Sequence, residues 1–168
     1  MLDETQEQEP LVSTIIVAPH PDDEIIGCFE QLKNPTNNIV IIYSGDTDAD
    51  RREKVLKLKE KVPHIKIQLF QQTVPQTFLS QTNRFFFPDP IYEVHPKHRE
   101  WGMMGEQLAR AKFDVTFYNT NMNAPYIHEV IMSDDKKFLL NEVYPDQKSL
   151  WEYDHKYFLF EGYNKWIF

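Results

Sequence analysis

Apolar residues occur along the chain in two patterns, short β-branched or aromatic runs and longer amphipathic stretches. The short runs are typical of strands that are buried on both faces of a sheet. They predict strands at Thr14–Ala18, Ile39–Tyr43, Ile65–Phe70, Phe85–Phe87, Val115–Tyr118 and Ile127–Met132. Apolar residues at helical spacing between the runs indicate helices. These helices are predicted at Glu24–Leu32, Asp50–Val62, His98–Lys112 and Asp135–Val143.

Strands and helices therefore alternate along most of the chain, which indicates parallel strands joined by right-handed crossovers. The sequence predicts an α/β fold, a Rossmann-like three-layer sandwich with a mostly parallel sheet. Ligands in such folds bind beyond the carboxyl ends of the strands. The 168 residues contain no internal repeat and fit a single domain at residues 11–168. The acidic and polar segment at residues 1–10 is expected to form a flexible tail.

Net charge, apolar runs and cysteine count indicate which partners and which cellular compartment to expect. The formal net charge of −8 argues against nucleic acid and against an anionic membrane surface as partners. The chain also lacks the run of about 18 apolar residues that a membrane span needs, and its first residues do not form a secretory signal. The one cysteine, Cys28, allows no disulfide within the chain, so a reducing, cytoplasmic location is expected. The lysines of the second helix are interpreted as a solvated face; they are Lys54, Lys57, Lys59 and Lys61.

The first candidate for chemistry is the stretch APHPDDE, residues 18–24, directly after the first predicted strand. His20 and Asp23 lie three positions apart, so one loop or helical turn can aim both at one point. Imidazole and carboxylate are ligands of divalent metals, zinc above all. Asp22 would then remain free beside the metal as a base. The alternative is a helix N-terminus, where Pro21 begins the helix and the acids complement its dipole. That alternative leaves His20 unexplained.

The second candidate is HPKHREWG, residues 95–102, after the fourth predicted strand. His95 and His98 open a helix and can supply a ligand and an acid or base, or they can simply face solvent. The other histidines, His64, His128 and His155, are interpreted as structural. Cys28 is interpreted as a small buried hydrophobe, and the aromatic residues from 157 to 168 as core or interface.

Together these motifs resemble the PIG-L/LmbE family of zinc-dependent N-acetylglucosaminyl deacetylases. The family has a strand followed by (A/P)HPDDE and a later HPDH motif; this chain reads APHPDDEIIG and PDPIYEVHPKHREWG. The segment SGD and then RRE at residues 51–53 is similar to the family's segment after its second strand. NAPYIHEV and KKFLLNEVYPDQ resemble its later strand and its helix with a Tyr-x-x-Gln ending. The resemblance covers the chain from about Ser13 onward.

The resemblance implies a role for each matched residue. His20, Asp23 and His98 would be the metal ligands, for Zn²⁺ or for Fe²⁺ or another divalent ion. Asp22 would be the general base. His95 would assist the oxyanion and protonate the leaving amine. The substrate-binding residue would be Arg51 or Arg52.

The implied function is hydrolytic removal of the acetyl group from an N-acetylglucosamine-type sugar or conjugate, by a zinc-activated water. The chain departs from the family at Lys97, where an aspartate usually stands between the two histidines. A cation there is expected to lower the pKa of His95, and Glu93 is an alternative carboxylate partner for that histidine. An alternative function is therefore a catalytically impaired relative that binds metal or sugar. The expected partner is a small N-acetylated sugar or glycoconjugate, and a homo-oligomer is possible through the aromatic tail.

Overall fold

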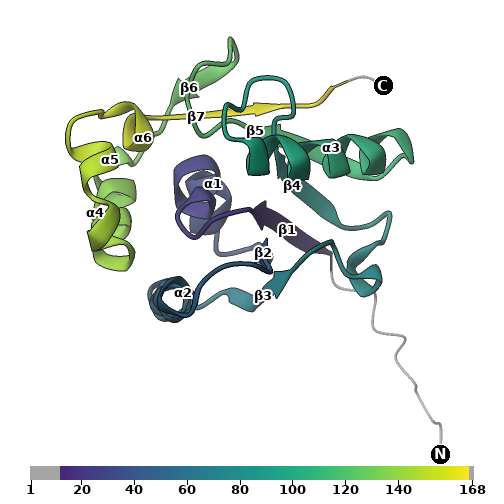
Figure 1. Ribbon diagram of the computed structural model, residues 1–168, viewed down its shortest axis with the longest axis horizontal. Coiled ribbons are helices and arrows are strands. Elements are labelled where there is room, and N and C mark those ends of the chain that lie inside the picture. Colours follow the sequence, from purple (N-terminus) through teal and green to yellow (C-terminus); the bar gives the residue numbers. More distant parts are fainter. Residues whose placement is uncertain (1–11, 167–168) are drawn as a thin grey trace, which may run out of the picture.

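The strands of the protein form one sheet, described here for residues 12–166 of a computed structural model (Figure 1). The seven strands have the order β3-β2-β1-β4-β5-β7-β6. They are β1 (Ser13–Ala18), β2 (Asn38–Ser44), β3 (Ile65–Gln71), β4 (Arg84–Pro88), β5 (Asp114–Tyr118), β6 (Ile127–Glu129) and β7 (Phe160–Asn164). Strands β1 to β5 pair in parallel, whereas β7 pairs antiparallel with both β5 and β6. The sheet is therefore mostly parallel.

Helices cover both faces of this sheet and complete a three-layer α/β sandwich (Figure 1). The α-helices are α1 (Asp23–Lys33), α2 (Ala49–Lys61), α3 (Pro96–Arg110), α4 (Ser133–Val143), α5 (Ser149–Glu152) and α6 (Lys156–Leu159). Two short 3-10 helices, η1 (Gln76–Phe78) and η2 (Pro145–Gln147), lie between them in the chain. None of the helices between residues 12 and 166 is long and apolar enough to cross a membrane.

Alternate residues of β1 face opposite layers of the core. Ile16 and Ala18 pack with apolar side chains of α1, α2 and α4, whereas Ile15 and Val17 pack with Trp101 of α3. All four β1 side chains are fully buried. This burial on both faces explains why β1 is a continuous apolar run in the sequence.

The predicted elements are present, with differences at their ends and near the C-terminus. Helix α3 begins at Pro96, two residues before the predicted start, because His95 caps it. Strand β6 is shorter than predicted, ending at Glu129. Strand β7 was not predicted, because its sequence FEGYN contains a glycine and no clear alternation. The flexible tail expected at residues 1–10 lies outside the described residues.

The aromatic tail contributes to the core within the described range. Phe158 is buried, and Tyr163 of β7 packs edge-on against Phe86 of β4 with ring centroids 5.7 Å apart. Cys28 is fully buried, as predicted, and burial raises the pKa of its thiol well above the ordinary value. These contacts confirm the core interpretation for this part of the chain.

Candidate metal centre

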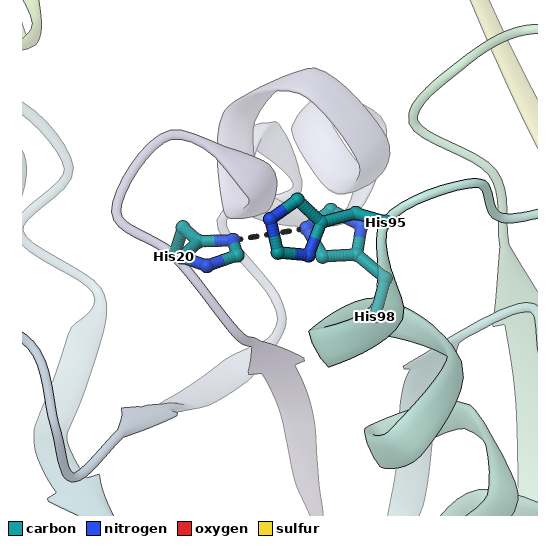
Figure 2. A group of neighbouring side chains, drawn as sticks. All are labelled: His20, His95 and His98. Atoms are coloured by element: carbon teal, nitrogen blue, oxygen red, sulfur yellow. Dashed lines mark hydrogen bonds between the residues drawn. The ribbon is translucent and has the colours of Figure 1, made fainter.

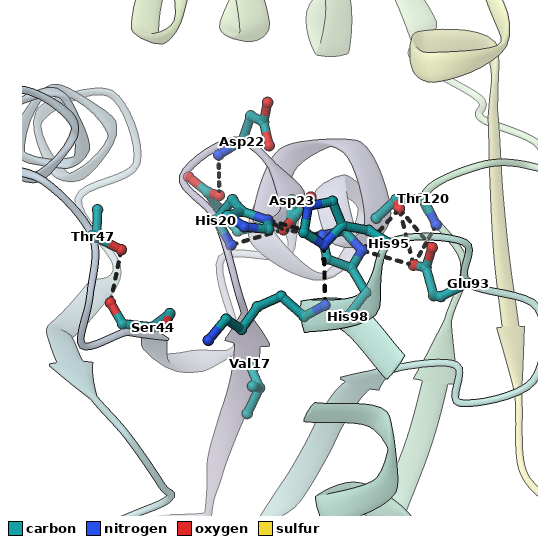
Figure 3. A network of polar contacts seen from close by, with 12 residues as sticks. Val17, His20, Asp22, Asp23, Ser44, Thr47, Glu93, His95, His98 and Thr120 are labelled. Carbon is teal, nitrogen blue, oxygen red and sulfur yellow. Dashed lines mark hydrogen bonds and ion pairs between the residues drawn. The ribbon is translucent and has the colours of Figure 1, made fainter. Parts of the chain in front are cut away.

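The two sequence motifs meet at the carboxyl edge of the sheet. Strand β1 ends at Ala18 and leads through His20 into α1, while β4 ends at Pro88 and leads through His95 into α3. The two strands are parallel neighbours, with Ile16 opposite Phe86. Connections from β1 and β4 run to opposite sides of the sheet, so the site lies at its topological switch point (Figure 3).

Donor atoms of three predicted ligands form a small triangle there. His20 Nδ1 lies 3.1 Å from His98 Nε2 and 3.5 Å from Asp23 Oδ2. His98 Nε2 lies 2.9 Å from the same Asp23 oxygen. Figure 2 shows the rings of His20 and His98 facing each other, with His95 beside them.

The triangle fits a tetrahedral metal ion. Zinc binds nitrogen and oxygen at about 2.0–2.2 Å, which places two ligands of a tetrahedral site roughly 3.3–3.6 Å apart. Of the three separations, 3.5 Å lies within that range, and 3.1 and 2.9 Å are a few tenths of an ångström shorter because these atoms contact one another directly. One histidine ring nitrogen of each of His20, His95 and His98 also lies within 4.8 Å of the others, so these three histidines can hold a metal ion together.

Asp23 is the anionic centre of this group. Its Oδ2 accepts a hydrogen bond from the backbone N–H of His20 at 2.8 Å, which folds the loop around the carboxylate. Burial alone would raise the pKa of Asp23, but His98 and His20 outweigh burial and lower it below the usual range. Asp23 is therefore ionised, as a metal ligand must be.

A buried carboxylate behind the site orients His98. Glu93 Oε1 lies 3.5 Å from His98 Nδ1, on the ring edge opposite Asp23. Glu93 also accepts a hydrogen bond from the backbone N–H of Thr120 at 2.9 Å (Figure 3). A further hydrogen bond to Glu93 comes from Asn121 Nδ2 at 2.7 Å. A carboxylate on Nδ1 leaves Nε2 of a histidine directed at a metal. Burial would lower the pKa of His98, but Asp23 and Glu93 raise it to about 10.

This arrangement corrects one prediction, because Glu93 contacts His98 rather than His95. The reason is the helical start of α3, which turns His95 out of reach of Glu93. His95 instead caps α3, and its Nδ1 accepts the backbone N–H of Lys97 at 3.1 Å. A neutral imidazole carries one hydrogen. With Nδ1 as acceptor, that hydrogen lies on Nε2 of His95.

Lys97 turns its ammonium group away from the histidines. Lys97 Nζ pairs with Asp46 at 3.3 Å and with Glu100 at 3.8 Å. The pKa of His95 is lowered, as predicted, mainly by burial and then by His20 and His98. Lys97 acts in the same direction with a smaller effect than these neighbours.

Asp22 has a strained backbone. Its φ of 115° lies in a region that favours glycine, and its side chain makes no capping hydrogen bond. Strain of this kind costs about 1–3 kcal/mol and persists only where neighbouring contacts enforce it. Burial, then the charges of Asp23 and Glu24, raise the pKa of Asp22 well above its ordinary value. The buried carboxyl is thus a stronger proton acceptor than an exposed aspartate.

An open cleft of about 430 Å³ adjoins these groups. It is lined by His20, Asp22, Asp23, Ile26, Arg51, His95, His98, Thr120, Asn121, Gln147, Leu150 and Tyr157. Every predicted site residue except Arg52 lines it. Arg52 instead donates to the carbonyls of Thr47 and Gly45 and stacks over the Phe70 ring, 4.6 Å from its centroid. Of the two arginines, only Arg51 is placed to meet a ligand in the cleft.

Three lining residues from the later part of the chain were not assigned from the sequence. Gln147, Leu150 and Tyr157 come from η2, α5 and α6, which follow α4 in the chain. Gln147 Nε2 is buried and has no hydrogen-bond partner among the described residues. The sequence pointed to Gln147 only through the YPDQ stretch, which resembles the family's Tyr-x-x-Gln ending but received no predicted function.

The remaining histidines lie away from the cleft. His64 Nε2 contacts the carbonyl oxygen of Leu32, and His128 Nε2 lies 3.0 Å from Glu30 Oε1. The ring of His155 packs against Phe158 with centroids 5.3 Å apart. These contacts agree with the structural interpretation of all three.

Comparison with known proteins adds no assignment. No family model matches this chain, and no curated protein sequence matches it significantly.

Proposed function

We propose that the protein is a metal-dependent N-deacetylase that hydrolyses an N-acetylglucosamine-type sugar or conjugate. The observation that carries the proposal is the triangle of His20 Nδ1, Asp23 Oδ2 and His98 Nε2, with separations of 2.9 to 3.5 Å. It opens on a cleft that holds Asp22 and His95. The PIG-L/LmbE resemblance of the two motifs supplies the reaction class and the sugar.

His20, Asp23 and His98 would hold the metal, which is zinc or another divalent ion that accepts two imidazoles and a carboxylate. Such an ion supplies Lewis acidity and lowers the pKa of a bound water to about 7. Glu93, 3.5 Å from His98 Nδ1, would hold that ring in place as a ligand.

Asp22 would accept the proton of the attacking water. Burial and the charges of Asp23 and Glu24 raise its pKa, which is the direction that makes a carboxylate a stronger base. Arg51, whose charge acts on Asp22, would bind the sugar from the same side of the cleft.

His95 would donate a hydrogen bond to the oxyanion through Nε2, since Nδ1 is occupied by the N–H of Lys97. Such donors stabilise charge that develops in the transition state. Protonation of the leaving amine by His95, which the resemblance implies, would require the imidazolium form, and the lowered pKa of His95 disfavours that form. The proton that Asp22 takes from the water would then pass to the amine nitrogen as the C–N bond breaks, which leaves acetate and the free amino sugar.

Metal content per chain is the first test of this function. Protein purified without chelator is expected to hold about one zinc or iron ion per chain, and Asp23→Ala is expected to lose it. Asp22→Asn should keep the metal but release no acetate from N-acetylglucosaminides. Absence of metal after zinc is supplied, or acetate release by Asp22→Asn, would refute the mechanism.

The alternative, an impaired relative that binds without hydrolysis, rests on Lys97. Pairing with Asp46 and Glu100 compensates its charge and weakens that alternative. Turnover that is absent from the natural chain but present in Lys97→Asp would favour it.

A further inference from the structure

Glu24 is a buried carboxylate that does not line the cleft. Its side chain is completely buried, and it accepts three hydrogen bonds. The donors are the backbone N–H of Asp22 at 2.9 Å, the hydroxyl of Tyr43 at 3.2 Å, and the hydroxyl of Tyr144. A single carboxylate thus connects α1, β2 and the end of α4.

The Asp22 contact matters because the backbone of that residue is strained. With φ at 115° and no capping bond from its own side chain, Asp22 needs an external contact to stay in place. The next backbone amide, that of Asp23, donates to the carbonyl of His20 at 3.1 Å, so the loop is held on both sides of the Asp22 peptide. Glu24 Oε2 is the partner of the Asp22 N–H itself.

Tyr144 holds Glu24 from the C-terminal end of α4. It is the one residue between α4 and η2, and Gln147 of η2 lines the cleft. Its ring is fully buried, so the hydroxyl has no access to water as an alternative partner. Loss of this hydroxyl would leave Glu24 Oε1 with the longer Tyr43 bond alone, at 3.2 Å, and so loosen the carboxylate whose other oxygen accepts the Asp22 N–H.

We propose that Glu24 and Tyr144 are positioning residues that hold the Asp22 carboxylate in its reactive orientation through the Asp22 backbone amide. The proposal rests on the proposed function in that Asp22 is the base. Neither residue touches substrate or metal in this scheme. A displacement of about 1 Å in a catalytic group can cost as much as a hundredfold in rate, so the effect belongs in kcat rather than in KM.

Tyr144→Phe tests the proposal, and Tyr163→Phe is its matched control. Tyr163 also donates its hydroxyl to a buried carboxylate, Glu161 Oε2 at 2.5 Å, and that carboxylate contacts Phe29 and Glu30 rather than Asp22. Both variants lose one hydroxyl-to-carboxylate bond. Only Tyr144→Phe is expected to lower kcat for an N-acetylglucosaminide, by tenfold or more, with KM within twofold and one metal per chain retained.

Hydrogen exchange at the Asp22 amide gives a measure that needs no turnover. The amide is expected to exchange at least tenfold faster in Tyr144→Phe than in Tyr163→Phe or the natural chain. Glu24→Gln, which keeps one acceptor oxygen, should give an intermediate rate. Unchanged exchange in Tyr144→Phe overturns the positioning role. Faster exchange in Tyr144→Phe, combined with a natural chain that holds metal but shows no deacetylase activity, would retain the positioning contact and refute the proposed function.

Discussion

Single residues at the candidate site are held in states that are costly on their own. Asp22 has both a positive φ and a buried carboxyl with a raised pKa. Glu24 is a fully buried acid whose pKa is raised to about 7, since burial outweighs the hydrogen bonds that favour its charged form. Such costs concentrate at functional sites because the surrounding structure compensates for them.

Relief of the Asp22 strain should stabilise the protein. Asp22→Gly removes both the Cβ that disfavours φ at 115° and a buried carboxyl, so we expect the free energy of unfolding to rise by about 1 kcal/mol. Urea unfolding measures this value, and acetate release should be lost. Asp22→Ala is the matched control, because it removes the carboxyl but keeps the strain. Equal stability of the two variants would contradict the strain argument.

Glu24 should make stability depend on pH. Its folded-state pKa of about 7 lies above the ordinary value of 4.5, so the neutral acid is favoured in the folded state. The stability it contributes is complete below pH 4.5 and is lost as the pH rises through 7. Thermal unfolding of chelator-treated protein between pH 4.5 and 8 should show this loss, and Glu24→Gln should flatten it. An unchanged pH profile in Glu24→Gln would count against the assignment.

At the scale of elements, helix α1 has a kink at Cys28, and side chains from two other elements bond to the backbone groups beside that kink. Cys28 has φ −134° and ψ 28°, which frees backbone groups on either side. Glu161 of β7 accepts the N–H of Phe29 at 2.6 Å, and Lys136 of α4 donates to the carbonyl of Ile26 at 2.6 Å. Both side chains are fully buried and pair with each other at 3.1 Å.

Removal of one partner of this pair should be costly. Lys136→Met leaves the charge of Glu161 buried without its counterion, so we expect a loss of about 3–5 kcal/mol in unfolding free energy. The double variant Lys136→Met with Glu161→Gln should recover part of it, because no buried charge then remains. Denaturant unfolding of the two variants measures the difference. A double variant no more stable than the single one would argue against charge burial as the cause.

Helix α3 must approach the loop that follows β4 closely for His95 and His98 to reach the cleft. A Cβ at Gly102 would lie 2.5 Å from the carbonyl oxygen of Pro88 and 2.8 Å from the nitrogen of Pro90, which are backbone atoms that cannot move aside cheaply. Gly102→Ala should therefore shift α3, cost about 1–3 kcal/mol of stability, and weaken metal binding through His98. Met103→Ala, at an exposed position on the same helix, is the control. Unimpaired metal binding in Gly102→Ala would contradict this account.

The whole molecule brings two distant segments of the chain together at one edge of the sheet. In the order β3-β2-β1-β4-β5, the connections from β1 and β4 diverge, and the cleft between them receives the motifs at residues 18–24 and 95–102. A metal bound there would join α1 to α3 and would bind only the folded chain.

Metal should therefore stabilise the fold by mass action. At free zinc a hundredfold above the dissociation constant, the free energy of unfolding is expected to rise by about 2.7 kcal/mol. Differential scanning fluorimetry with zinc and with chelator measures the change in Tm. Asp23→Ala should remove the difference between the two conditions. A zinc effect that survives in that variant would place the ion elsewhere.

Local patterns in the sequence were sufficient for most elements and for the two candidate motifs. Buried parallel strands are continuous apolar runs, so β1, β2, β4 and β5 follow from short stretches of sequence. A helix that follows a strand keeps its polar start at the sheet edge, so the same stretches place the two histidine motifs there. The ligand role of His98 came from the family resemblance. Strand β7 did not follow, since its pairing partners in β5 and β6 lie far away in the chain.

Contacts between distant residues were decided only by the tertiary structure. Because of how α3 packs, Glu93 contacts His98, and His95 Nδ1 accepts the Lys97 amide instead. Arg51 lines the cleft, whereas Arg52 bonds to the loop after β2. The C-terminal end of α4 places the Tyr144 hydroxyl on Glu24. Periodicity reports which face of an element is buried, but not which side chain of another element meets it. Those partners depend on the packing of the whole sheet and its helices.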